Sequence, residues 1–146
     1  MQILSNLLLT LLLCCIPGFT YAQSLSLELY PQPQQIVISN QQYVPSHGYT
    51  LQGISNPDAD AVKILKEALP FVQSGKSLPL EVKKLKVRTP EMERSGAYIL
   101  DISKKKITIE IVDDRSLFYA AQTLKQLVGY NEAGKRTLPL CTITDY

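Results

Sequence analysis

Pairs of acidic residues are the parts of this sequence whose types and spacing could do chemistry. They are Asp113 with Asp114, Asp58 with Asp60, and Glu91 with Glu93. Two neighbouring carboxyl groups can cleave a glycosidic bond, one as general acid and the other as base or nucleophile. The first two pairs stand where predicted helices begin, and carboxylates there cap backbone N–H groups. The third stands in a polar connection. We therefore expect caps and solvated side chains, and no catalytic residue, at all three places.

The other reactive side chains are single copies. His47 is the only histidine, and a Ser-His-Asp triad would have to use it, although "PSHGY" reads as a loop. Cys141 is the only cysteine after residue 22, which leaves no internal disulfide and no cysteine-based metal site. We expect it to be a buried, small apolar residue. The sequence contains no phosphate-binding loop, dinucleotide fingerprint or metal-spaced His/Glu motif, so no cofactor is predicted.

The first 22 residues have the layout of a secretory signal. An apolar run spans residues 7–16, followed by Pro17, Gly18 and small residues up to Ala22. Such a run is too short to cross a bilayer. Cys14 and Cys15 also suggest a lipoprotein signal, but no small residue precedes them, so lipid anchoring is the less favoured interpretation. We predict a signal peptide at 1–22 and an exported, periplasmic or extracellular, domain at 23–146.

The charge of the chain excludes some partners. A formal net charge of +2 is too small to indicate binding to nucleic acid or to an anionic membrane. The basic cluster of Lys83, Lys84 and Lys86 has no interleaved aromatic residues, so it predicts a solvated sheet edge rather than a binding patch. No other segment is long and apolar enough to span a membrane.

The patterning predicts an α+β fold, in which a mixed β-sheet has two helices packed on one face. Asn56 and Pro57 mark the start of the first helix, and Pro70 bends or ends its last turn. The second helix, 115–128, links the last two predicted strands and is long enough for a crossover. The predicted strands lie at 36–38, 48–53, within 77–89, and at 97–102, 107–112 and 138–143.

The second helix, "RSLFYAAQTLKQLV", carries more aromatic surface than one stripe can bury. Leu117, Leu124 and their neighbours fall in one sector at 100° per residue and would pack on the sheet. Phe118 and Tyr119 fall outside that sector. With Gln122 they form a candidate domain-docking surface, although a neighbouring loop would cover them equally well.

Several segments resemble the N-terminal domain of bacterial β-N-acetylhexosaminidases of glycoside hydrolase family 20 and of the related family 84 O-GlcNAcase-like enzymes. They are "LYPQPQQIVI", "SGAYILDISKKKITIEIVDDRSLFYAAQTLKQLV" and "LPLCTITDY". One departure is Ser116, which stands where these domains usually have glycine.

The resemblance implies a small accessory domain ahead of a catalytic (β/α)₈ barrel. In that family, acids of the barrel protonate the glycosidic oxygen and position the acetamido group of the substrate, which acts as nucleophile. None of those acids maps onto this sequence. The expected function is therefore that of an exported accessory domain in N-acetylglucosaminide breakdown, itself without the barrel. The alternatives are a free-standing glycan-binding module that uses Tyr98, Phe118 and Tyr119, or an inactive gene fragment.

Overall fold

The computed structural model describes residues 27–56, 59–86 and 89–146, so the predicted signal peptide lies outside the described residues. The strands run in the order β1-β7-β4-β5-β3-β2, and β6 pairs with β7. Their bounds are Gln35–Tyr43 for β1, Gly48–Gln52 for β2, Ser77–Lys84 for β3, Tyr98–Ile102 for β4, Ile107–Ile111 for β5, Gly129–Tyr130 for β6 and Arg136–Asp145 for β7. Two α-helices, α2 (Asp60–Ala68) and α3 (Asp114–Leu127), and the short 3₁₀ helix η2 (Glu91–Glu93) complete the described elements.

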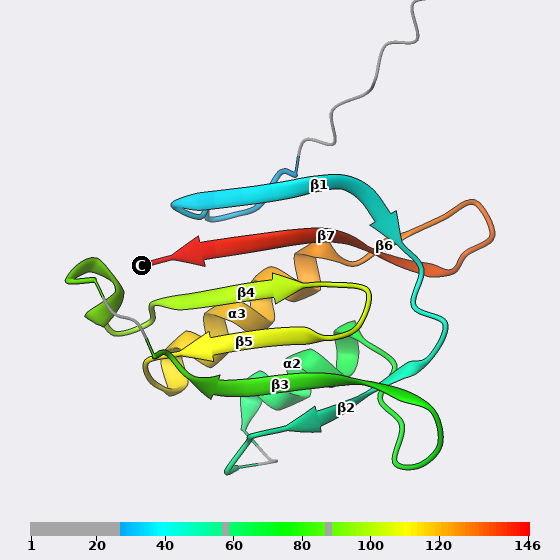
Figure 1. Cartoon of the computed structure of the whole chain (residues 1–146), viewed down its shortest axis with the longest axis horizontal. Coiled ribbons are helices and arrows are strands. Elements are labelled where there is room, and N and C mark those ends of the chain that lie inside the picture. The colour runs from blue at the N-terminus through cyan, green and yellow to red at the C-terminus, as the bar shows by residue number, and fades with distance from the viewer. Residues whose placement is uncertain (1–26, 57–58, 87–88) are drawn as a thin grey trace, which may run out of the picture.

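The sheet is mixed, as predicted. β2, β3 and β5 are parallel, whereas β4, β7 and β1 each run antiparallel to their neighbours. Helix α2 connects β2 to β3, and α3 connects β5 to β7 across the intervening β4. Figure 1 shows both helices on the same side of the strands, which confirms the predicted α+β architecture. No helix in the described part of the chain is long and apolar enough to cross a membrane.

Alternation of side chains along the strands decides which face is buried. Ile107, Ile109 and Ile111 of β5 are all buried, as their shared face predicted. The same layer holds the stripe of α3, whose Leu124 is fully buried and whose Leu117 is 6% exposed. Burial of each large side chain in this layer contributes ~1.5–3 kcal/mol.

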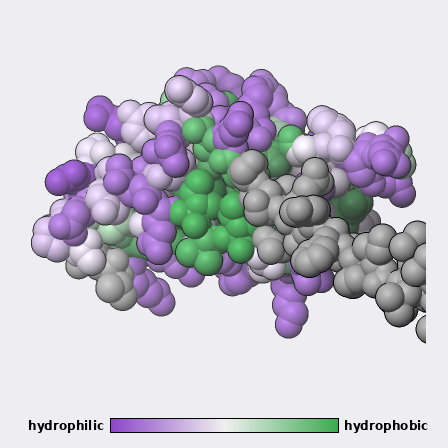
Figure 2. Space-filling view, turned by 90° about the horizontal axis from the view of Figure 1, so that it is seen from above, coloured by the Kyte–Doolittle hydropathy of each residue, from purple (hydrophilic) through white to green (hydrophobic). Residues whose placement is uncertain are grey.

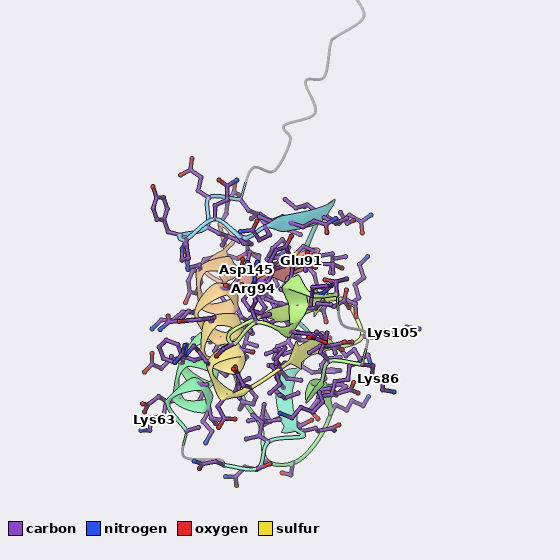
Figure 3. All side chains as sticks on the ribbon, turned by 90° about the vertical axis from the view of Figure 1, so that its left-hand side faces the viewer. Lys63, Lys86, Glu91, Arg94, Lys105 and Asp145 are labelled. Atoms are coloured by element: carbon purple, nitrogen blue, oxygen red, sulfur yellow. The ribbon has the colours of Figure 1, made fainter. Side chains whose placement is uncertain are left out.

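Much of the opposite face of the sheet is polar, apart from a small apolar cluster in which Ile99 of β4 packs against the buried Leu85, Met92 and Ala97. Lys106 pairs with Glu81 at 2.8 Å, and the Thr142 hydroxyl donates to Asp101 at 2.8 Å. Figure 3 shows Lys105 on the side of the molecule opposite Lys63, which belongs to the helix layer. An antiparallel region with one apolar and one polar face needs only a single helix layer.

The first helix is shorter than predicted. It begins at Asp60, with Ala59 at the N-cap position and no side-chain cap, so Asn56 does not cap it. Pro57 and Asp58 lie outside the described residues. The helix ends at Ala68, before Pro70 as expected. It ends there because the following segment turns extended and bonds to β2.

The basic cluster lies at the end of β3, a strand that is otherwise interior to the sheet. β3 lies between β2 and β5, because it pairs in parallel with both. Lys83 forms an ion pair with Glu110 at 3.1 Å, and Lys84 Nζ donates to the Val112 carbonyl at 3.1 Å. The lysines therefore stand at the end of an interior strand, where their long side chains reach past the sheet to acceptors on β5 and beyond it. The register of β3 with β2 ends at Glu81, so Lys83 and Lys84 pair with β5 alone. They are exposed at a locally unpaired side of the sheet, as predicted, although β3 as a whole is not an edge strand.

Replacing Leu124 with alanine tests the helix–sheet layer. The side chain is fully buried, so we expect Leu124→Ala to lower the free energy of unfolding by ~2–5 kcal/mol. Denaturant titration followed by circular dichroism measures this. Lys125→Ala, at the next position and in an exposed ion pair with Glu67, should change it by less than ~1 kcal/mol. Equal effects of both variants would contradict the assignment of the buried stripe.

Candidate domain-docking site

The start of α3 is fixed by a capping box. Asp113 occupies the N-cap position, and its Oδ1 accepts a hydrogen bond from the Ser116 N–H at 2.9 Å. The Ser116 hydroxyl in turn accepts from the Asp113 N–H at 3.2 Å. Both of these N–H groups would otherwise lack partners. The serine that departs from the family pattern is therefore a reciprocal partner in the cap, and Asp113 rather than Asp114 is the capping residue.

The same carboxylate also holds the segment that precedes β4. The Ser95 hydroxyl donates to Asp113 Oδ2 at 2.6 Å, and the Gly96 N–H donates to Oδ1 at 3.2 Å. Burial alone would raise the pKa of Asp113, but the hydrogen bonds from Ser95, Ser116 and Gly96 outweigh it and lower that pKa to about 2. The carboxylate is thus a charged structural node.

The remaining acids are dispersed. Asp114 is exposed in the first turn of α3, and Asp60 pairs with Lys63 at 2.9 Å. Glu91 and Glu93 are exposed on η2, where Met92 is the buried residue. Within the described ranges, no three or more His, Cys, Asp or Glu side chains are grouped to hold a metal ion.

Neither His47 nor Cys141 lies on the outer surface of the helix layer. His47 is exposed in the loop before β2, and its Nδ1 lies 2.7 Å from the carbonyl of Ser46. Cys141 is 5% exposed in the core, as expected of a small apolar residue. Burial, with a smaller contribution from Asp101, raises the pKa of this thiol to about 11, which keeps it protonated and unreactive.

Phe118 and Tyr119 lie together on the outer side of α3, where the sequence predicted them. Their side chains are 38% and 45% exposed, and the rings meet edge-to-face with centroids 6.0 Å apart. Gln122 is half-buried on the same helix, one turn further along. The rest of the large apolar residues of α3 are buried, so this pair is the exposed apolar feature of the helix. Their use in docking stays a prediction.

A loop covers part of the aromatic pair, as one of the two interpretations left open by the sequence predicted. Gly96 has φ +93°, and a Cβ at this position would lie 2.8 Å from Cε2 of Tyr119. The ring of Tyr119 therefore packs on the glycine backbone. Phe118, on the other flank, lines a hollow of about 350 Å³ together with Ala61 at the start of α2 and Val82 at the end of β3. Each ring is supported on one side and open on the other.

Tyr98 does not belong to any surface. Its side chain is 1% exposed, and its hydroxyl lies 2.7 Å from the hydroxyl of Thr123 on α3. Burial raises the pKa of Tyr98 to about 12, although the hydrogen bond with Thr123 opposes this. The prediction that Tyr98 contacts a glycan was wrong, because β4 is a central strand and the side chain of Tyr98 faces the helices.

The comparison with known families decides the assignment. The model for glycosyl hydrolase family 20, domain 2, matches residues 26–146. The chain belongs to this family.

Solved structures of this family and of related hydrolases share the fold. CpGH84B superposes with a TM-score of 0.66 at 22% identity, over 82% of this chain and 22% of that protein. The exo-β-N-acetylglucosaminidase of Vibrio harveyi gives 0.59 at 23% identity, over 80% and 18%. The β-N-acetylhexosaminidase of Bacteroides fragilis gives 0.61 at 19% identity, over 82% and 25%. This chain therefore spans a quarter or less of each of these proteins. The predicted family resemblance is confirmed.

Sequence reasoning missed a clamp on the C-terminal half of α3. The side chain of Gln126 accepts from the Tyr30 N–H at 2.9 Å and donates to the Tyr30 carbonyl at 2.9 Å. This two-point contact holds the segment before β1 against α3. Since the partners are 96 residues apart, no local pattern in the sequence signals it.

The cap predicts a pH-dependent stability. Asp113→Ala should lower the free energy of unfolding by ~0.5–2 kcal/mol near neutral pH. The folded pKa of about 2 lies below the unfolded value of ~3.9. The stabilisation is therefore complete above pH ~4 and is lost as the pH falls from ~4 towards 2. Denaturant titrations at about pH 6 and about pH 2.5 should show the two proteins converging, and a constant difference would contradict this.

The packing of Tyr119 on Gly96 predicts an energetic coupling. Gly96→Ala should cost about 1–3 kcal/mol, because it adds both backbone strain and a clash with the ring. Tyr119→Ala removes only the clash, so the double variant should be more stable than the sum of the two single effects implies. A double-mutant cycle by thermal denaturation measures this, and strict additivity would show that the ring does not rest on the glycine.

Proposed function

We propose that this chain is the accessory domain of an exported β-N-acetylhexosaminidase-like glycoside hydrolase. In this proposal the outer surface of α3 around Phe118, Tyr119 and Gln122 holds a catalytic (β/α)₈ domain. The observation that carries the proposal is the exposed aromatic pair on a helix whose other large apolar residues are buried. Aromatic residues at the centre of an exposed patch are typical of docking surfaces.

The surface is suited to docking because its support is rigid. The capping box fixes where α3 begins, and the buried Leu117 and Leu124 hold the helix against the core. Tyr119 is held by its contact with Gly96. Little side-chain entropy would then be lost when a second domain covers the rings, which favours association.

Catalysis is assigned to the partner domain. The acidic pairs of this chain are dispersed in caps, ion pairs and exposed turns, and Asp113 is fully committed to structural hydrogen bonds. The Vibrio harveyi and Bacteroides fragilis relatives are a β-N-acetylglucosaminidase and a β-N-acetylhexosaminidase. They support N-acetylglucosaminides as the substrate class of the assembled enzyme. The layout of residues 1–22 supports export.

Substitution of the aromatic pair tests the docking surface. Phe118→Ser and Tyr119→Ser should weaken the association with the family 20 catalytic domain of the same organism by roughly tenfold or more each, because buried aromatic anchors dominate such interfaces. Calorimetric titration of the two domains measures this. Tyr130→Ser is the matched control, because Tyr130 is 65% exposed but lies on β6 rather than α3. Equal effects at Tyr119 and Tyr130 would sink the proposal.

The purified chain should release no product from an aryl N-acetylglucosaminide. The reason is that Asp113 is occupied by structural hydrogen bonds, and of the two carboxylates that line the hollow beside Phe118, Asp60 is ion-paired with Lys63 and Asp114 stands in the first turn of α3. Measurable turnover that disappears in the double variant Asp113→Asn, Asp114→Asn would overturn the assignment of catalysis to a partner. Saturable binding of chitin oligomers by the chain alone would instead favour a glycan-binding module.

A further inference from the structure

The two outermost strands of the main sheet, β1 and β2, contain no charged residues. No Asp, Glu, Lys or Arg occurs between Glu28 and Asp58, and this interval contains both β1 and β2. These strands stand at the two ends of the strand order. By contrast, β3, β4, β5 and β7 each carry at least one charged residue. Proteins usually place charges on edge strands to prevent other strands from pairing with them. Here the distribution is reversed.

The two edges differ in whether they are covered. The Tyr49 N–H of β2 donates to the Pro70 carbonyl at 2.7 Å, and the Val72 N–H donates to the Tyr49 carbonyl at 3.0 Å. The segment after α2 thus pairs with the outer side of β2 at Tyr49. Within residues 27–56, 59–86 and 89–146, no segment pairs with the outer side of β1. This edge is open as well as uncharged.

The open edge also presents apolar surface. Val37 is 57% exposed, and its neighbours Ile36 and Ile38 are only partly buried against the core. Figure 2 looks down on this side of the molecule and shows a hydrophobic patch that is bordered by hydrophilic residues on its left-hand side. An uncharged edge strand with exposed apolar side chains is a template for strand addition.

We propose that β1 pairs antiparallel with β1 of a second copy of this chain about a two-fold axis. Such pairing places the residue on the axis opposite its own symmetry mate, so a charge there would meet a like charge, and it places Gln35 opposite Ser39 of the other copy when Val37 is on the axis. The strand has no charged residue. Its Gln35 and Ser39 can each donate and accept a hydrogen bond and so suit a partner of the same kind. The net charge of +2 leaves little long-range repulsion between copies.

The irregularity of β1 places the axis. The register with β7 shifts between Ser39 and Gln42, so the regular part of the strand is Gln35–Ser39. Val37 is the centre of this part and would face its symmetry mate. The dimer does not use Phe118, Tyr119 or Gln122, so it is independent of the proposed docking surface and a failure of either proposal leaves the other standing.

Charge variants at Val37 test this pairing. Sedimentation equilibrium of the purified chain should show a reversible monomer–dimer equilibrium. Val37→Lys and Val37→Glu should each weaken the dimer by about three- to tenfold, through like-charge contact at the axis and loss of apolar burial. An equimolar mixture of the two variants should restore it, because lysine then faces glutamate. Gln52→Lys adds a charge at the opposite edge of the sheet, on β2, and should leave the dimer unchanged.

A chain that stays monomeric at all concentrations, or a dimer indifferent to both Val37 variants, would overturn the proposal. Hydrogen exchange gives a second readout: protection of the β1 amides should rise with protein concentration. Protection that is high and independent of concentration would show that another part of the same chain covers the edge, and would also refute it. Circular dichroism and thermal unfolding confirm that the variants keep the fold.

Discussion

The position of α3 depends on one carboxylate. Asp113 accepts hydrogen bonds from the helix start and from the segment before β4, so the helix, the end of β5 and the start of β4 share one fixed point. A side chain with four possible acceptor sites can do this only while it is charged. The orientation of the side chains on the outer side of α3, including the aromatic pair, therefore depends on the Asp113 carboxylate.

The same node explains why an acidic pair in this chain is not catalytic. A catalytic carboxylate needs free lone pairs directed at a substrate and a pKa near the working pH. Asp113 has its acceptors occupied by Ser95, Gly96 and Ser116, and its pKa is lowered to about 2 rather than raised. Proximity of two acids in sequence is thus a weak guide to chemistry where a helix begins.

Much of the fold was predictable because its signals are local or periodic. The alternation in "ITIEI" placed β5 and its buried face, and the stripe of leucines in α3 placed the helix on the sheet. The family resemblance then indicated the architecture. The order of strands was not predictable: the lysines suggested an edge strand, whereas β3 pairs with both β2 and β5 and is open on one side only beyond Glu81. The prediction for Tyr98 was wrong for the same reason, since the burial of its side chain depends on neighbours far away in sequence.

For the candidate site, the helical periodicity identified Phe118 and Tyr119. The contact with Gly96 and the two hydrogen bonds between Gln126 and Tyr30 could be found only in the tertiary structure.

The clamp by Gln126 has a mechanical consequence. The two hydrogen bonds to the backbone of Tyr30, together with the buried side chain of Leu29, fasten the beginning of the described chain to α3 rather than to the sheet. Tension applied upstream of this point is therefore borne first by the helix layer. β1 and its neighbour β7 are spared from being peeled apart, since a load must break the fastening at Gln126 before it reaches the strand. The contact between Gln126 and Tyr30 thus protects the pairing of β1 with β7 from a pulling force.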